Sequence, residues 1–393
     1  MELTLTQRSE QVLVQVDGAD SHSFAAAEIV LKRDDPLAAY DPQPYGQRLY
    51  RALFAPDSLA ARAWADSAAT PATHALLLVI PDAALQRVPW EYLYDGQAYL
   101  ALAAPLTRGL PAAQRVAFNA NAHAAGNVLV VASDPLLYPN GAPVVALNVA
   151  RERANVRAAF DKANAAFHVT FVKPPTRDEL HKALTRVAPP AILHFLGHGT
   201  ATPQGAQLLF EDALAQGHSV DAAQVIAPAR DKLFMVYFNS CETAMALDAS
   251  ASNDSTASNL AYSLARAGVP YALGMQLEVP EIAALRFSEF LYLHLAQGET
   301  VERALWQARR ALWDDENLMR TALSDGGTID LRAFCLGIPV LYTALASPTG
   351  IRVAAGAAEI FQVAPRREFD PRIPPPQVFR GRSRELVAIG RLL

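Results

Sequence analysis

The chain has few cysteines, no surplus of basic residues and no long apolar run, and each shortage excludes a class of protein. Its 393 residues include two cysteines, Cys241 and Cys335, which are too few for a disulfide framework and favour a reducing, cytoplasmic compartment. Lys and Arg number 34 against 39 for Asp and Glu, so no basic surface for nucleic acid is expected. No stretch of about 18 apolar residues is present, and the first residues lack a basic and then apolar pattern. We therefore expect neither a membrane-spanning helix nor a signal peptide.

Apolar residues make up 51% of the chain, and their spacing predicts an α/β fold. Short continuous apolar runs, typical of strands covered on both faces, alternate with amphipathic helical stretches. This alternation predicts a mostly parallel sheet with helices on both faces. The predicted strands lie at residues 127–132, 168–172, 191–195, 233–238, 271–274 and 339–343, and the first of them is a continuous apolar run.

Changes in composition divide the chain into four parts, in line with the two to three domains that its length predicts. Residues 1–120 are predicted to form a small α+β module, in which 29–32 looks like one of the strands. Residues 121–346 contain the alternating strands and helices of the core. Residues 347–378 are predicted to be a proline-rich linker, and 379–393 a basic turn that opens an amphipathic helix.

Two of the predicted strands end in residues that can carry out covalent chemistry. His198 follows the strand at 191–195, and Cys241 follows the strand at 233–238. Active residues gather at the carboxyl ends of parallel strands, so His198 and Cys241 meet if these strands are neighbours. A thiolate is a nucleophile, and an imidazole supplies both a base and a charge that lowers the thiol pKa. The alternative is a buried cysteine and a core histidine, but the pairing of two such strand ends favours the reactive pair.

The surroundings of His198 allow an oxyanion hole and, as an alternative, a metal site. Gly199 leaves room for a substrate carbonyl, so its N–H and that of Cys241 are candidate oxyanion donors. His194 and His198 have the spacing of zinc ligands on a helix. Gly197 and the apolar strand pattern argue against a helix, and no second cysteine pair is present. We therefore predict no metal and no cofactor, with His194 as a satisfied core histidine.

Acidic residues near two strand ends are candidates for binding a cationic substrate side chain. Asp134 follows the strand at 127–132, and Glu278 follows the strand at 271–274. A carboxylate recognises Arg or Lys through charge-assisted hydrogen bonds. Asp134 precedes Pro135, so a turn-forming role is an equally simple interpretation.

The two strand ends together resemble the CHAT domain, a caspase-like cysteine peptidase family related to separase. The matching segments are Leu-His-Phe-Leu-Gly-His-Gly at 193–199 and Asn-Ser-Cys-Glu-Thr-Ala at 239–244. Further similarity is found in Pro-Trp-Glu at 89–91, Ser-Asp-Pro at 133–135, and the segments 267–276 and 336–342. The resemblance covers about residues 74–345.

The resemblance implies a caspase-like fold and a peptide-cleaving dyad, with His198 as general base and Cys241 as nucleophile. Some relatives carry Asp two residues before the cysteine, where it binds a basic P1 side chain. Asn239 occupies that position here, so selectivity for Arg or Lys would depend on Asp134, Glu278 or another acid. The expected role is a regulated endopeptidase that cleaves a protein substrate in a bacterial-type signalling or defence system.

The last residues resemble the entry segment of signalling ATPases. The segment Phe-Arg-Gly-Arg-Ser-Arg-Glu-Leu at 379–386 implies that an NTPase or sensor region of a longer chain is a partner; the alternative is a tail with chance similarity. Two other functions remain open: a catalytically silent adaptor that relays the state of such an NTPase, and a thiol hydrolase or transferase acting on a small molecule.

Overall fold

The computed structural model describes residues 1–31, 40–71, 73–118, 125–202, 205–212, 215–240, 260–322 and 327–362. Cys241 and the predicted segment 379–393 lie outside these residues. No helix within the described ranges is long and apolar enough to cross a membrane.

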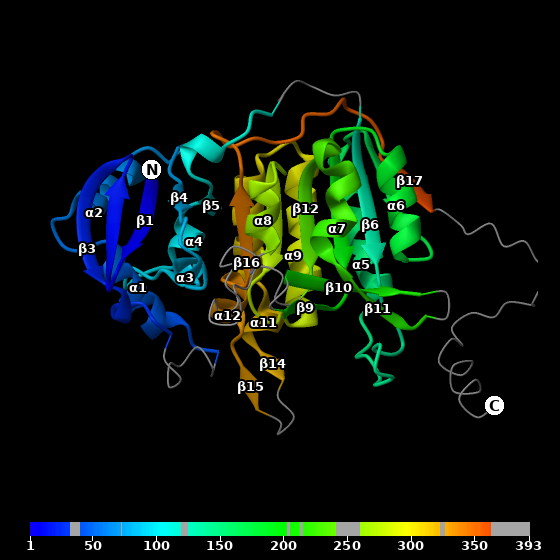
Figure 1. Cartoon of the computed structure of the whole chain (residues 1–393), viewed down its shortest axis with the longest axis horizontal. Helices are drawn as coiled ribbons and strands as arrows, with labels where there is room; N and C mark the ends of the chain where they lie inside the picture. Colours follow the sequence, from blue (N-terminus) through cyan, green and yellow to red (C-terminus); the bar gives the residue numbers. More distant parts are fainter. Residues whose placement is uncertain are drawn as a thin grey trace, which may run out of the picture.

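A twelve-stranded sheet runs through the molecule (Figure 1). Its core half has the order β17-β7-β6-β8-β12-β13-β16. The strands from β7 to β13 are parallel, and β16 is antiparallel to β13. The bounds are β6 Gly126–Ala132, β7 Phe167–Phe171, β8 Ala191–Leu196, β12 Leu233–Asn239, β13 Tyr271–Met275, β16 Pro339–Thr343 and β17 Glu359–Gln362.

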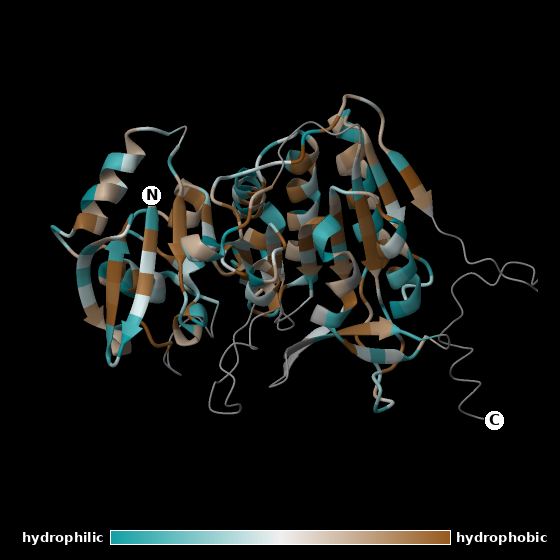
Figure 2. Cartoon of the chain, turned by 45° about the horizontal axis from the view of Figure 1, so that its top comes forward, coloured by the Kyte–Doolittle hydropathy of each residue, from teal (hydrophilic) through white to brown (hydrophobic). Residues whose placement is uncertain are grey.

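Helices cover both faces of the core half, because alternate side chains of each buried strand face opposite sides. One apolar cluster joins Val128, Val130 and Tyr237 to the helices α5 (Val149–Ala163), α9 (Glu281–Ala296) and α10 (Val301–Trp313). The other joins Leu129, Leu193 and Val236 to α6 (Arg177–Arg186), α7 (Ala222–Ile226) and α8 (Leu260–Arg266). Figure 2 shows apolar residues concentrated on the central strands. The predicted fold class, α/β with a mostly parallel sheet and helices on both faces, is confirmed.

The N-terminal residues extend the same sheet and also have an apolar core of their own. β1 (Glu2–Arg8), β2 (Gln11–Val16), β3 (Ala19–Ala25), β4 (Leu76–Val79) and β5 (Leu106–Gly109) complete the order β16-β5-β4-β1-β2-β3. The helices α1 (Gln43–Leu53) and α2 (Leu59–Ala68) contribute Tyr45, Leu49 and Trp64 to this N-terminal core. A domain boundary near residue 120 stays a prediction, since the sheet is continuous across the two halves.

Two predicted segments differ from the structure. The strand expected at residues 29–32 is wrong, because Ile29 follows the 3-10 turn Ala26–Glu28 and is buried, with its carbonyl accepting the Tyr45 hydroxyl hydrogen bond at 2.7 Å. Within the expected linker, β17 adds to the edge of the sheet in parallel with β7, and residues 363–378 lie outside the described residues. Edge pairing of this kind satisfies backbone groups that a free linker leaves to water.

A small separate sheet lies after β8, where the sequence analysis placed no strands. Its strands are β9 (Gly199–Thr202), β10 (Gly205–Glu211) and β11 (Gly217–Asp221), all antiparallel in the order β11-β10-β9. Leu208 and Phe210 of β10 point into the core beside Phe195. This packing joins the segment after His198 to the main sheet.

Candidate active site

The two reactive strand ends lie side by side. β8 and β12 are neighbouring parallel strands, and their last rung pairs Leu196 with Asn239. The Gly197 N–H still donates to the Asn239 carbonyl at 3.4 Å. His198 follows two residues after Leu196, and Cys241 is two residues after Asn239 in the sequence. The predicted adjacency of these strands is confirmed, although Cys241 itself lies outside the described residues.

His198 is held by the loop that follows β6. Its Nε2 atom is 2.8 Å from the Val145 carbonyl oxygen, and its ring meets that of Tyr138 edge-on with centroids 6.3 Å apart. A carbonyl only accepts, so Nε2 must carry the hydrogen that is donated to Val145. In the neutral imidazole the remaining lone pair then belongs to Nδ1. The hydrogen bond to Val145 fixes the orientation of the ring. The side chain is partly exposed, so solvent can reach it.

The turn into His198 requires a small residue. A Cβ atom added to Gly197 would come within 2.7 Å of the Phe195 ring and 3.2 Å of the Ser133 carbonyl oxygen. Beyond His198, the chain enters β9 directly, with Gly199 paired to Leu208. The Leu209 N–H donates to the His198 carbonyl at 2.9 Å, so the backbone on both sides of the imidazole is fixed.

Asp134 helps to close the loop that carries Val145. Its Oδ1 atom accepts the Leu147 N–H at 3.0 Å, and its own N–H donates to Oε1 of Glu211 at 3.0 Å. Burial raises the pKa of the Glu211 carboxyl, while the Asp134 N–H partly offsets this effect. These contacts fit the turn-forming interpretation of Asp134, and its role in substrate binding stays a prediction.

Asn239 lies in a buried polar cluster on the face covered by α5 and α9. Its Nδ2 atom donates to the Ser288 hydroxyl at 3.4 Å, and Ser288 also bonds the Tyr237 hydroxyl at 2.9 Å. Beside them His194 stacks on Tyr237, with ring centroids 4.5 Å apart and planes 18° apart. His194 is fully buried, as expected of a core residue, but among the described residues neither of its ring nitrogens has a hydrogen bond, so it is not the satisfied core histidine that was predicted.

Glu152 completes this cluster from the first turn of α5, and it was not among the predicted site residues. Its Oε1 atom is 3.6 Å from Nε2 of His194, and the Ser288 hydroxyl and the Asn239 amide act on the same carboxyl group. Burial raises the pKa of Glu152 to about 8, an effect that Ser288 and Asn239 partly offset. Burial lowers the pKa of His194 to about 3. At neutral pH the pair is therefore mostly uncharged, which explains how both groups tolerate complete burial.

The third predicted substrate residue, Glu278, lies elsewhere. It is exposed in the connection between β13 and α9, and among the described residues no hydrogen bond or ion pair of its carboxylate is found. Cys335, by contrast, is buried and has a pKa raised to about 12 by that burial. Its burial and raised pKa fit a structural thiol.

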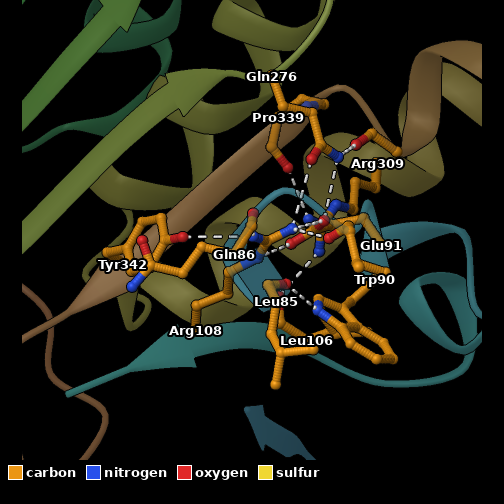
Figure 3. A network of polar contacts seen from close by, with 12 residues as sticks. Leu85, Gln86, Trp90, Glu91, Leu106, Arg108, Gln276, Arg309, Pro339 and Tyr342 are labelled. Carbon is orange, nitrogen blue, oxygen red and sulfur yellow. Dashed lines mark hydrogen bonds and ion pairs between the residues drawn. The ribbon is translucent and has the colours of Figure 1, made fainter. Parts of the chain in front are cut away.

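A buried ion pair accounts for the Pro-Trp-Glu segment, for which the sequence analysis gave no role. Glu91 Oε1 accepts from Nε of Arg108 at 2.9 Å, and Oε2 accepts from Nη2 at 2.6 Å (Figure 3). Both side chains are fully buried. Burial alone lowers the pKa of Arg108, but the Glu91 carboxylate beside it raises that pKa overall. Gln276, which follows β13, bonds both partners and brings this network to the same edge of the core sheet as His198.

Comparisons with solved structures give distant similarities. The chain is 16% identical to separase in the Saccharomyces cerevisiae separase-securin complex, with 70% of this chain and 15% of that chain covered and a TM-score of 0.43. For the Arg-specific cysteine proteinase gingipain R, the identity is 11%, the coverage 81% and 76%, and the TM-score 0.45. For the Drosophila initiator caspase Dronc, the identity is 13%, the coverage is 60% of this chain and 85% of that chain, and the TM-score is 0.35. The chain thus spans only a small part of separase.

The family comparison is more extensive. No curated protein gives a significant match to the sequence. The family model of the CHAT domain matches residues 43–335, which include the Pro-Trp-Glu segment, β8 with His198, β12 and Cys335. Since this match spans well over half of the sequence, the chain belongs to the CHAT domain family.

Proposed function

We propose that this chain is a cysteine endopeptidase in which His198 is the general base and Cys241 the nucleophile. The observation that supports this most directly is the hydrogen bond from Nε2 of His198 to the Val145 carbonyl, because it leaves Nδ1 as the basic nitrogen. Cys241 is bonded to Ser240, the residue that follows the rung between Leu196 and Asn239. The strand ends that lead to the two residues are neighbours, which is why we propose that the two side chains act together.

The proposed reaction is an acyl transfer in two halves. Nδ1 of His198 takes the thiol proton of Cys241, and the sulfur forms a bond to the substrate carbonyl carbon. The scissile C–N bond then breaks, and the amine leaves with the proton from the imidazole. Water, deprotonated by the same imidazole, attacks the thioester, releases the acid and restores the thiol. The N–H groups of Gly199 and Cys241 are the proposed donors to the oxyanion that forms in each half.

A protein is the proposed substrate, and its selection is assigned to residues near the dyad. Asn239 offers no charge to a P1 side chain, and its amide is engaged with Ser288. Asp134 and Glu278 are the proposed acidic contacts, with Glu278 the more accessible because its carboxylate is exposed.

We also propose that the peptidase is regulated by an NTPase or sensor region attached through residues 363–393, in a bacterial-type signalling or defence system. The support is the similarity of residues 379–386 to the entry segment of signalling ATPases. In the alternative function, the chain is a silent adaptor. It would pass the state of the attached NTPase on to a partner without cleaving any substrate. A reactive Cys241 separates the two, since an adaptor has no use for a thiolate.

The test is labelling of Cys241 by a library of peptidyl electrophiles, followed by mass spectrometry of the intact protein. A peptidase forms one adduct at Cys241, and excess peptide substrate slows the labelling. Cys335→Ala is the matched control and should label as the wild type does. His198→Asn should slow labelling at Cys241 by at least 100-fold, because the base is lost. Equal labelling of wild type and His198→Asn would contradict the dyad.

A further inference from the structure

The end of β13 separates from β12 next to the proposed nucleophile. The ladder between the two strands has rungs from Met235 to Tyr237 and ends where Tyr237 pairs with Leu273. β12 continues along β8 as far as Asn239, whereas β13 continues along β16 to Met275. Among the described strands, β12 is therefore paired only with β8 at the edge where His198 lies, and β13 only with β16. Active residues of open α/β sheets gather at this carboxyl edge of the strands.

Gln276 holds the end of β13 to the side away from β12. Its N–H donates to the Ile338 carbonyl at 3.0 Å, and its Nε2 donates to the Gly337 carbonyl. The same Nε2 donates to Oε2 of Glu91 at 3.0 Å, and Oε1 accepts from Nη2 of Arg108 at 3.3 Å. Every polar atom of this buried side chain is thus used to fix the strand end (Figure 3).

Glu91 and Arg108 are in turn fixed by the N-terminal half. Arg108 lies on β5 and donates further hydrogen bonds to the Gln86 carbonyl at 2.7 Å and the Val88 carbonyl at 3.1 Å. The network therefore runs from the turn before the Pro-Trp-Glu segment, through a fully buried ion pair, to the carboxyl end of β13. A buried ion pair that is satisfied at every donor is rigid, because moving either partner leaves a charge without compensation.

We infer that Glu91, Arg108 and Gln276 are positioning residues of the proposed peptidase, which hold the end of β13 in place beside the strand end that leads to Cys241. This inference rests on the proposed function. None of the three is expected to touch the substrate. Their effect is on the position of the end of β13 beside β12, and hence on the placement of Cys241 relative to His198. An error of about 1 Å in such placement can lower a rate by two orders of magnitude.

The chain offers a matched pair of variants to test this. Gln276→Met and Tyr342→Phe each remove one neutral hydrogen-bond partner of Arg108 and leave its pair with Glu91 intact. Tyr342 lies on β16 and does not hold the end of β13. We expect a lower melting temperature for Gln276→Met, which also loses its bonds to Glu91 and Gly337. At a temperature where both variants are folded, we expect a kcat at least 10-fold lower for Gln276→Met alone, with KM changed less than threefold. An unchanged kcat, or equal losses in both variants, would overturn the inference.

A second readout does not depend on turnover. The pH midpoint for alkylation of Cys241 by iodoacetamide reports how closely the thiol is paired with His198. A positioning role predicts a higher midpoint and slower alkylation in Gln276→Met than in Tyr342→Phe, even if the wild type cleaves no peptide. Should Gln276→Met fail to fold, Gln276→Asn keeps an uncharged amide but withdraws it by one methylene from Glu91, Arg108 and Gly337. Alkylation that is the same in the wild type and the folded Gln276 variant would refute the positioning role.

Discussion

Glu152 and His194 face each other across 3.6 Å with both side chains fully buried, directly below the strand ends that lead to the proposed dyad. Burial shifts their two pKa values in opposite senses, since each group is driven toward its uncharged form. The pair therefore supplies polar contacts beneath the active site without a buried charge at neutral pH.

Glu152→Gln should remove a pH-dependent loss of stability. The pKa of Glu152 is raised from an ordinary 4.5 to about 8, so the folded protein holds a proton that the unfolded chain releases. Stability from this group is complete below about pH 4.5, falls as the pH rises toward 8, and is constant above that. We expect the variant to be more stable than the wild type by about 1–3 kcal/mol at pH 8 and equal to it near pH 4. Urea unfolding at both pH values measures this, and a gain that is the same at each pH would contradict it.

His194→Phe should protect the protein against acid. The pKa of His194 is lowered from 6.5 to about 3, so the unfolded chain takes up a proton that the folded protein does not. The wild type therefore loses stability from this group as the pH falls from 6.5 toward 3. Phenylalanine retains a ring to stack on Tyr237 and does not titrate. The urea midpoints at pH 7 and pH 4 should differ less in the variant than in the wild type. An equal difference in both proteins would contradict the prediction.

Gly197→Ala should impair both stability and catalysis. The added Cβ would lie 2.7 Å from the Phe195 ring and 3.2 Å from the Ser133 carbonyl, so the turn that leads into His198 must shift. A loss of about 1–3 kcal/mol in unfolding free energy is expected, together with slower alkylation of Cys241. Gly356→Ala is the control, because its Cβ would meet only Ala166 at an ordinary 3.6 Å. The prediction fails if both variants behave alike.

Arg108→Met should be among the most damaging single substitutions in the chain. It leaves the Glu91 carboxylate buried without a counter-charge, which costs about 3–5 kcal/mol. Arg157→Met provides the comparison, since Arg157 pairs with Asp161 at 3.9 Å on an exposed helix face and should cost less than about 0.5 kcal/mol. The melting temperatures of the two variants measure these two losses of stability. Similar melting temperatures would mean that the buried pair adds nothing to the fold.

The strands β6, β7, β8, β12, β13 and β16 were predictable because each is a short, mainly apolar segment between helical stretches, and the neighbouring positions of β8 and β12 followed from their order along the chain. β5 was missed because Leu-Thr-Arg-Gly at its position contains a charged residue, which local sequence patterns assign to the surface. Arg108 is tolerated there only because Glu91 comes from another element. Glu152 was missed for the same reason: its neighbours His194 and Asn239 come from two strands that are distant in sequence.

His198 could be found from the sequence because a histidine between two glycines at a strand end is a local pattern. The tautomer that makes Nδ1 the basic nitrogen was not predictable, since it depends on the carbonyl of Val145, an exposed residue in an irregular loop. Sequence reasoning thus identified the residue types of the site but not the contacts that orient them.

The joint between the two halves of the sheet has a consequence for how the molecule can be divided. β5 and β16 share only two rungs, Arg108 with Tyr342 and Gly109 with Thr343. Removing the N-terminal half would turn β16, which is buried along its whole length, into an open edge with unpaired backbone groups. Exposed apolar edges of this kind pair with other chains, so a truncated core is expected to aggregate rather than to fold as an independent peptidase.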